Sequence, residues 1–345
     1  MGARVAPPLA ISLGDPAGVG PELIATAWTM RDTNGLPPFM VIGGARILAE
    51  AAAQRGIAVP VRAIADVAEA AGVFATALPV LELDADDTDV AYCPGKPDPA
   101  GARLALNSLR TATNLVVEGL ASGVVTGPVS KARLAEEGFT HPGQTEFVAA
   151  QCGVASHDAV MLLAGPQLKA VPLTVHCALA DVPGLLSQDL ICNRTRIVAH
   201  AMVQDFGIAH PRLAICALNP HAGEEGRMGS EEQAIIAPAI AALQAEGIDA
   251  TGPHAADSLF SPHARPHYDV ALAMYHDQAL IPLKALDFDA GVNMTLGLPI
   301  VRTSPDHGTA FAIAGQGTAN PGAMVAAIRM AGAAAARRAA TPLSA

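Results

Sequence analysis

Aromatic side chains and charged side chains are both scarce in this sequence. Of its 345 residues, only 3% are Phe, Trp or Tyr and 15% are charged, whereas 51% are hydrophobic. Such a composition excludes a disordered chain, because disordered segments lack the apolar residues that build a core. The core is predicted to consist of Ala, Val, Leu and Ile, which suits helices packed on a parallel sheet. A chain of this length is expected to form two lobes.

Basic residues are fewer than acidic residues in this sequence. The 21 Lys and Arg residues stand against 32 Asp and Glu residues, and the net charge is −11 at pH 7. Nucleic-acid binding normally needs a basic face, so no nucleic-acid partner is expected. A phosphorylated small molecule stays compatible with this charge, because a local cationic pocket is enough to bind it. No stretch is long and apolar enough to span a membrane, so no membrane partner is expected.

Cysteine pairs with metal-site or redox spacing are missing. The five cysteines are odd in number and scattered, and no C-x-x-C occurs, which is typical of reduced thiols in the cytoplasm. The N-terminal residues 1–6 are not followed by the apolar region of a signal peptide. We therefore expect a cytoplasmic protein.

Strand-like and helix-like segments alternate along the chain, which is the pattern of an α/β fold. The patterns predict strands at 9–13, 39–42 and 123–126, and helices at 45–54, 102–118, 130–137, 190–203, 231–245 and 324–340. A hinge is predicted near 126–131, with a return of the chain near Arg302. The expected lobes are residues 1–130 with 300–345, and residues 131–299.

Three apolar runs each end on a histidine. They are Val171–His176, Leu213–His221 and Val270–His276, and each is predicted to be a buried strand. Ligands of an open parallel α/β sheet bind beyond the carboxyl ends of its strands. Three imidazoles at that edge can hold one Zn²⁺-like ion and leave a coordination position open. The alternative is three unrelated histidines, each satisfied by its own loop.

Two loops join a predicted strand to a predicted helix. Gly14–Glu22 is not the dinucleotide-binding G-x-G-x-x-G, because its glycine spacing differs. Gly20 and Pro21 favour a helix start there. Thr126–Lys131 either offers N–H groups to an anion or is an ordinary turn in which Ser130 caps the helix.

Polar and glycine-rich positions follow the last histidine run. Lys284, Asn293 and Arg302 supply two cations and a neutral donor, a set that suits a phosphate or a carboxylate, although a lone Lys or Arg usually lies on the surface. The segment Ser304–Pro321 is rich in glycine and turns, which lets a backbone approach a flat ligand closely.

Five motifs occur together in this sequence, namely Gly14-Asp-Pro-Ala-Gly-Val-Gly-Pro-Glu22, Thr126-Gly-Pro-Val-Ser-Lys131, Leu218-Asn-Pro-His-Ala-Gly-Glu224, Tyr275-His-Asp-Gln278 and Arg302-Thr-Ser-Pro-Asp-His-Gly-Thr309. Together they resemble one family, 4-hydroxythreonine-4-phosphate dehydrogenase of pyridoxal-phosphate biosynthesis. The loop that ends at Pro321 is similar to the cofactor loop of isocitrate and isopropylmalate dehydrogenases. The resemblance implies an α/β, two-lobed, isopropylmalate-dehydrogenase-like three-layer fold with a cleft between the lobes.

The resemblance also implies roles for individual residues. It implies that three histidines bind a divalent metal (Zn, Mg or Co) and are shared across a homodimer interface, namely His176, His221 and His276. It implies substrate binding by Gln144, Thr145, Lys284, Asn293 and Arg302, and binding of NAD or NADP by His307, Gly308, Gly315, Gly317 and Asn320. Two positions depart from the family pattern, because Gln144 replaces a histidine and Ala312 replaces an acidic residue of the wider group.

The implied reaction is metal- and NAD(P)-dependent oxidation of 4-phosphooxy-L-threonine to 2-amino-3-oxo-4-phosphooxybutanoate. This β-keto acid then decarboxylates to 3-amino-2-oxopropyl phosphate. Asp257 and Asp277 are candidate catalytic residues that handle protons or support the metal ligands. Their alternative roles are a helix cap and a loop carboxylate.

Other functions stay open at this point. A related dehydrogenase of the family would act on 4-phospho-D-threonate, D-erythronate or a terephthalate dihydrodiol. A three-histidine zinc hydrolase would use the same metal ligands, but it would not need the glycine-rich loop. A non-catalytic phosphosugar-binding protein would leave the three histidines without a role.

Overall fold

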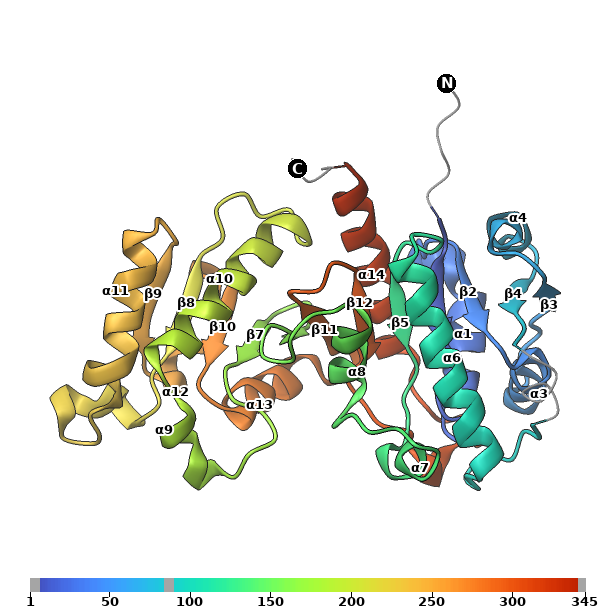
Figure 1. The fold of residues 1–345 in the computed structure, drawn as a ribbon, viewed down its shortest axis with the longest axis horizontal. Coiled ribbons are helices and arrows are strands. Elements are labelled where there is room, and N and C mark those ends of the chain that lie inside the picture. Colours follow the sequence, from blue (N-terminus) through green and yellow to red (C-terminus); the bar gives the residue numbers. More distant parts are fainter. Residues whose placement is uncertain (1–6, 84–89, 341–345) are drawn as a thin grey trace. The chain divides into compact units, whose positions relative to one another are not determined.

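The computed structural model describes residues 7–83 and 90–340, which form two compact units (Figure 1). The first unit runs to Ser156 and resumes at Leu298, and the second unit comprises His157–Gly297. The N-terminal residues 1–6, on which the signal-peptide expectation rested, lie outside the described residues. Within the described chain, every helix is too short or too polar to cross a membrane.

The first unit is built on parallel strands. In sheet order they run β3-β4-β2-β1-β5-β12, and each neighbouring pair is parallel. Their bounds are β1 Leu9–Ser12, β2 Phe39–Ile42, β3 Val61–Ile64, β4 Leu78–Leu81, β5 Val124–Thr126 and β12 Arg302–Pro305. The central strands β1 and β2 are buried along their whole length, which explains why they lack polar alternation.

Long helices cover this part of the sheet. The α-helices are α1 Gly20–Thr29, α2 Arg31–Asn34, α3 Ala45–Arg55, α4 Ala70–Phe74, α6 Pro99–Val117, α7 Lys131–Glu136, α8 Gln144–Gln151 and α14 Gly322–Ala340, and the short 3₁₀ helices are Val67–Glu69 and Phe311–Ile313. Helix α6 packs on β1, β2 and β5, and α14 packs on β12, β5 and β1 (Figure 1). Helix α6 starts where Asp98 Oδ1 accepts a 2.7 Å hydrogen bond from the Gly101 N–H and where Pro99 fits the first turn.

The second unit has a mixed set of strands. Their sheet order is β11-β6-β7-β10-β8-β9. The bounds are β6 Val160–Ala164, β7 Lys169–Pro172, β8 Leu213–Cys216, β9 Ala250–His254, β10 Val270–Ala273 and β11 Val292–Leu296. Strand β6 is antiparallel to both β7 and β11, whereas β7, β10, β8 and β9 are parallel.

The expectation of a wholly parallel sheet is therefore wrong for β6. Only a short loop joins β6 to β7, and a connection that short permits a hairpin but no crossover.

Helices cover this unit as well. The α-helices are α9 Val182–Leu185, α10 Gln188–Gln204, α11 Ala237–Ala245, α12 Ala256–Leu259 and α13 His276–Asp287. The shorter helices are Leu179–Asp181, Pro220–Gly226, Arg265–His267 and Phe288–Ala290, with a π-helical turn at Glu232–Ile236. Helix α13 packs on β7, β10 and β6, and α10 packs on α11, β6 and β11.

The unit boundary differs from the sequence expectation. The first unit extends to Ser156 rather than to residue 130, because α7 and α8 both pack on α6. The chain returns to the first unit at Leu298, close to the expected residue 300. The strands expected at 9–13, 39–42 and 123–126 and the terminal helix expected at 324–340 are confirmed with small shifts of their ends.

Candidate active site

Three neighbouring strands of the second unit lead to the three histidines. Strand β10 lies between β7 and β8 and is parallel to both, with Leu272 opposite Val171 on one side and Ile215 on the other. The three carboxyl ends therefore lie at the same edge of the sheet, as the sequence predicted. The side chains of His176, His276 and His221 follow within a few residues of these ends.

Two of the histidines face each other. The ring centroids of His176 and His276 are 5.9 Å apart. Both side chains line a cavity of about 240 Å³ together with Cys177, Tyr275 and Asp277. The His276 Nδ1 atom is 2.8 Å from Asp277 Oδ1, so Nε2 is the nitrogen that can take a ligand. A carboxylate that orients an imidazole in this way is typical of metal-binding histidines.

The third histidine lies in a left-handed turn. The residues of this turn, His221–Glu225, all have positive φ, between 43° and 75°. For residues other than glycine this backbone costs on the order of 1–3 kcal/mol each, so other contacts must hold it.

Glu232 fixes the residues just before this turn. Its carboxylate is only 3% exposed and accepts hydrogen bonds from the N–H groups of Leu218 at 2.9 Å and Asn219 at 2.7 Å. Gly223 is required beside it, because a Cβ at that position would lie 2.6 Å from Glu232 Oε2.

The structure thus brings His176 and His276 together but not His221. Among the described residues, no three His, Cys, Asp or Glu side chains lie close enough together to hold a metal ion. The donor chemistry nevertheless fits a divalent ion such as Zn²⁺ or Co²⁺, which prefer imidazole ligands. Asp257 is exposed on α12, and that helix packs on the Pro220–Gly226 segment.

The first unit contains a buried cation, the guanidinium of Arg302. Arg302 is 3% exposed, and it donates hydrogen bonds to Thr126 Oγ1 at 2.8 Å and to Thr145 Oγ1 at 3.3 Å. Burial lowers the pKa of Arg302 to about 10, so the guanidinium stays charged at neutral pH. The Glu146 carboxylate opposes this decrease in pKa. A guanidinium is a cation whose planar donors suit a phosphate or a carboxylate.

Gln144 contacts the residue that follows Thr126. Its Nε2 donates a 3.2 Å hydrogen bond to the Gly127 carbonyl. Its Oε1 is buried and has no hydrogen-bond partner among the described residues. Because a buried acceptor is normally satisfied, this atom is a candidate contact for a bound ligand.

The other two predicted anion-binding residues belong to the second unit. Lys284 lies on the exposed side of α13. Asn293 lies on β11 opposite Leu163, and its buried Oδ1 also lacks a partner in the part of the chain that is described.

The glycine-rich loop packs on the Gly14–Glu22 loop. The Val19 N–H donates to the Thr309 carbonyl at 2.9 Å. Gly18 allows this approach, because a Cβ there would lie 2.8 Å from the same carbonyl oxygen. His307 Nδ1 lies 3.0 Å from the carbonyl oxygen of Gly308.

The later part of this loop is fixed by α3. Gln54 donates to the Gly315 carbonyl at 2.9 Å and Arg55 donates to the Ala319 carbonyl at 2.8 Å. Gly315 and Gly317 both have positive φ, which explains the glycines. Asn320 Oδ1 accepts a hydrogen bond from the N–H of Gly322, the first residue of α14, at 2.9 Å.

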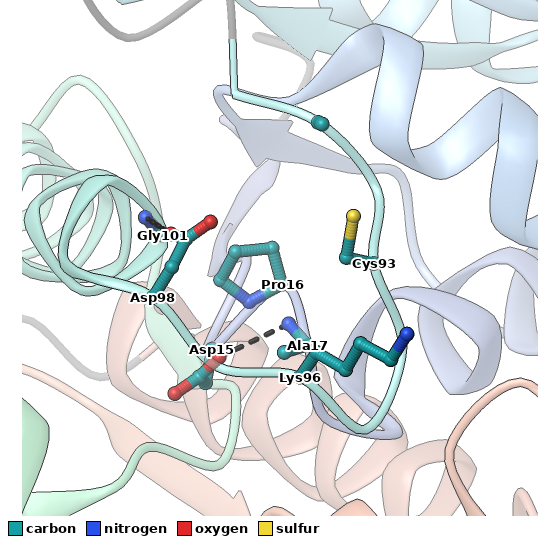
Figure 2. Close-up of a pocket in the computed structure, with 8 residues that line it drawn as sticks. Asp15, Pro16, Ala17, Cys93, Lys96, Asp98 and Gly101 are labelled. Carbon is teal, nitrogen blue, oxygen red and sulfur yellow. Dashed lines mark hydrogen bonds between the residues drawn. The ribbon is translucent and has the colours of Figure 1, made fainter.

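Asp15 is a buried acid at the start of the Gly14–Glu22 loop. It is 3% exposed, and its Oδ1 accepts a 3.0 Å hydrogen bond from the Ala17 N–H (Figure 2). Burial raises the pKa of Asp15, and the nearby Asp98 charge adds to the increase. Both carboxylates line a small pocket with Pro16, Cys93 and Lys96 (Figure 2). At about 10 Å³ this pocket has room for one water molecule.

Comparison with known proteins decides the family. Residues 36–331 match the family described as pyridoxal phosphate biosynthetic protein PdxA. The chain belongs to this family. A 4-hydroxythreonine-4-phosphate dehydrogenase from Erythrobacter litoralis is 64% identical over 96% of this chain and 98% of its own length. The resemblance seen in the sequence, and with it a dehydrogenase of pyridoxal phosphate biosynthesis, is confirmed.

Solved structures agree with this assignment. A 4-hydroxythreonine-4-phosphate dehydrogenase from Klebsiella pneumoniae has a TM-score of 0.84 at 36% identity, covering 96% of this chain and 99% of that one. A terephthalate 1,2-cis-dihydrodiol dehydrogenase from Burkholderia xenovorans has a TM-score of 0.64 at 29% identity, covering 94% and 97%. A branched-chain phosphotransacylase from Enterococcus faecalis shares the α/β fold, with a TM-score of 0.51 at 12% identity, covering 94% and 99%.

Sequence reasoning missed one residue and one contact of the site. Glu232 binds the N–H groups of Leu218 and Asn219 from a π-helical turn. Thr126 was named as the start of the Thr126–Lys131 loop, but its hydrogen bond from Arg302 was not predicted. The Leu218–Glu224 motif was recognised, but nothing in its spacing shows that an acid further along the chain binds its backbone.

We predict that Asp15→Asn raises the unfolding temperature at neutral pH. The amide keeps the acceptor for Ala17 and removes a buried charge. A raised pKa means that the folded state binds the proton more tightly. As the pH rises from 3.8 through the raised pKa, the unfolded state loses its proton before the folded state does, so the free energy of unfolding of the wild type falls. Above the raised pKa this loss of stability is constant.

Thermal unfolding across this pH range tests the Asp15 prediction. The advantage of Asp15→Asn should shrink as the pH falls toward 3.8, and the exposed control Asp289→Asn should show no such trend. A variant that is no more stable than wild type at neutral pH would contradict the prediction.

Proposed function

We propose that the protein oxidises 4-phosphooxy-L-threonine to 2-amino-3-oxo-4-phosphooxybutanoate with NAD or NADP. The product then decarboxylates to 3-amino-2-oxopropyl phosphate. Membership of the PdxA family supports this assignment. The structural observation that carries it is that three adjacent parallel strands deliver histidines to one edge of the sheet.

In this proposal His176, His221 and His276 bind one divalent metal, either Zn, Mg or Co. A divalent ion bound there supplies Lewis-acid polarisation of a substrate hydroxyl group. Asp277 holds the His276 ring through Nδ1, which leaves Nε2 to bind the ion. Asp257 and Asp277 are the proposed proton-handling residues.

The anionic end of the substrate is bound by three residues in the proposal. Arg302 contributes a desolvated charge that is already held by Thr126 and Thr145. Lys284 adds a second charge, and Asn293 offers a side-chain amide whose buried oxygen lacks a protein partner among the described residues. Gln144 and Thr145 bind the polar groups near the reacting carbon.

The cofactor is assigned to the glycine-rich loop. His307, Gly308, Gly315, Gly317 and Asn320 are the proposed contacts to NAD or NADP. Anchoring of the loop by Gln54 and Arg55 supports this role, because a loop fixed in advance loses little conformational freedom on binding. The nicotinamide supplies the hydride chemistry, and the protein positions it.

The proposal extends to the assembly. The two units are proposed to form an isopropylmalate-dehydrogenase-like three-layer fold with a cleft between the lobes. The working form is proposed to be a cytoplasmic homodimer whose active site lies at the subunit interface.

One alternative substrate has a specific observation in its favour. The family histidine is replaced by Gln144, and a structural relative at 29% identity is a terephthalate dihydrodiol dehydrogenase. The buried Arg302 favours a phosphorylated substrate instead. A hydrolase would not form reduced nicotinamide, so an absorbance assay of reduced nicotinamide distinguishes a hydrolase from a dehydrogenase.

We predict that His176→Ala, His221→Ala and His276→Ala each abolish oxidation and lower the bound metal while the fold persists. The assay follows reduced nicotinamide by absorbance, with and without a chelator, and metal content is measured in parallel. The exposed His210 of the same unit gives a matched control, since His210→Ala should retain metal and activity. Full metal occupancy in two of the three variants would overturn the ligand assignment.

We predict that Lys284→Met lowers kcat/KM for the phosphorylated substrate by about 10- to 150-fold, because a charged hydrogen bond contributes about 1.5–3 kcal/mol. With 4-hydroxy-L-threonine the wild type should be slow, and Lys284→Met should change its kcat/KM little. Equal turnover of the two substrates by wild type would show that the phosphate assignment is wrong.

We predict that Gln144→His changes the pH profile of kcat/KM more than the order of substrates. Histidine adds a group that titrates near pH 6.5 at this position, whereas the amide does not titrate. The test compares 4-phosphooxy-L-threonine, 4-phospho-D-threonate and a terephthalate dihydrodiol with both proteins. A wild type that prefers either of the last two, together with a Gln144→His variant that prefers the first, would identify Gln144 as a specificity switch and refute the proposed substrate.

A further inference from the structure

An ion pair between two helices of the first unit reaches the glycine-rich loop. Glu22 lies in the first turn of α1, Arg55 is the last residue of α3, and these two helices pack on each other. Arg55 Nη1 donates a 3.0 Å hydrogen bond to Glu22 Oε2. Nη2 of the same guanidinium donates to the Ala319 carbonyl at 2.8 Å. One side chain therefore connects the acid that ends the Gly14–Glu22 motif to the loop that is proposed to bind the cofactor.

Burial makes each charge of this ion pair dependent on the other. The Glu22 side chain is 1% exposed and the Arg55 side chain is 13% exposed. The second carboxylate oxygen, Glu22 Oε1, is buried and has no hydrogen-bond partner among the described residues. Because water cannot take the place of a missing partner at such a position, the Glu22 carboxylate holds the guanidinium in one place.

The guanidinium gives this link a direction. Its nitrogens form a rigid planar fork, whereas lysine has a single nitrogen on a flexible stem. Once Glu22 fixes Nη1, the direction of Nη2 toward Ala319 is also fixed. The stem of Arg55 passes close to the same loop, because a Cβ at Gly317 would lie 3.8 Å from Arg55 Cγ.

The Gly14–Glu22 motif supports the glycine-rich loop at two points. At the first point, the Val19 N–H donates to the Thr309 carbonyl at 2.9 Å. At the second point, Glu22 acts through Arg55 on Ala319. The motif lacks the glycine spacing of a dinucleotide-binding loop, and these contacts give it a different role, that of a support for the loop.

We propose that Glu22 is a positioning residue for NAD or NADP, which acts through Arg55 to hold the loop from Thr309 to Ala319 in its binding conformation. Glu22 itself is shielded from any ligand by its burial. A loop that is fixed in advance loses less conformational freedom on binding, so loosening it lowers the affinity for the cofactor. This inference rests on the proposed function, because it assigns a purpose to one anchor of the proposed cofactor loop.

Two variants change the link while they keep the volume of the buried pair. Glu22→Gln keeps the length of the side chain and one acceptor oxygen, but it removes the negative charge that holds the guanidinium. Arg55→Lys keeps a positive charge for Glu22, but it replaces the fork by one nitrogen, which cannot hold Glu22 and Ala319 in the same fixed directions. Loss of part of a charged hydrogen bond corresponds to about 5- to 10-fold in affinity.

The first unit offers a matched control for Glu22. Glu137 also pairs with an arginine, since Arg103 Nη1 lies 3.3 Å from Glu137 Oε2. This pair connects α6 to the end of α7, and no hydrogen bond links it to the glycine-rich loop within the described residues. Glu137→Gln therefore makes the same chemical change without touching the loop.

The experiment titrates NADH and NADPH into the full-length protein by calorimetry and continues with the nucleotide that wild type binds more tightly. Glu22→Gln and Arg55→Lys should each bind it about 5- to 10-fold more weakly, and Glu137→Gln should match wild type. The double variant of Glu22 and Arg55 should lose no more than the weaker single variant, because both changes act on the same contact.

Two further measurements separate positioning from a general loss of structure. Amide hydrogen exchange of the cofactor-free protein should become faster in the loop from Thr309 to Ala319 and stay unchanged in the sheet. In the activity assay, KM for the oxidised nucleotide should rise by the same factor as the dissociation constant, whereas kcat and KM for 4-phosphooxy-L-threonine should change little.

The outcomes distinguish this inference from the proposed function. Wild-type affinity and wild-type exchange in both variants would overturn the positioning role and leave the cofactor assignment intact. Faster exchange of the loop with wild-type affinity would overturn the assignment of the cofactor to this loop, and the inference with it. A wild type that binds neither nucleotide would overturn the proposed function. If Glu22→Gln does not fold, Arg55→Lys, which keeps both charges, decides the matter.

Discussion

Parallel pairing of β7, β10 and β8 is the constraint on which the candidate site depends. Because the register of β10 is fixed against both neighbours, the chain must leave all three strands at the same edge of the sheet. This pairing brings His176 and His276 together, whereas the position of His221 also depends on the turn that carries it. Backbone pairing ends a few residues before the histidines. Beyond that point, the hydroxyl of Thr174 and the amide of Gln278 form the hydrogen bonds that link the strand ends.

Two buried ionisable residues of the first unit lower stability when they are charged. Arg302 and Asp15 are both held away from water, and burial shifts the pKa of each toward the neutral form. Thr126 and Thr145 accept hydrogen bonds from Arg302, the Glu146 charge raises the pKa of Arg302, and the Ala17 N–H donates to Asp15. Buried ionisable residues with shifted pKa values cluster at functional sites.

Features that depend on local pattern were predictable from the sequence. The buried strands that end before His176, His221 and His276 could be recognised from short aliphatic runs, and the turn glycines from their positions before helices. The family motifs implied the function, and the comparisons with known proteins confirmed it. The strand β6 and its antiparallel placement were not predicted, although the short loop that joins β6 to β7 permits only a hairpin. The contacts of Glu232 and Thr126 could not be predicted, because their partners are backbone atoms and a residue far away in the sequence.

The left-handed His221 turn has a consequence for the order in which the site can form during folding. Its backbone is unfavourable alone, and the Glu232 carboxylate that binds the N–H groups just before it enters with the π-helical turn before α11. The strands that lead to His176 and His276 pair with each other within the sheet. The His221 turn is thus expected to become ordered only when the segment around α11 has docked, after the strands themselves have paired.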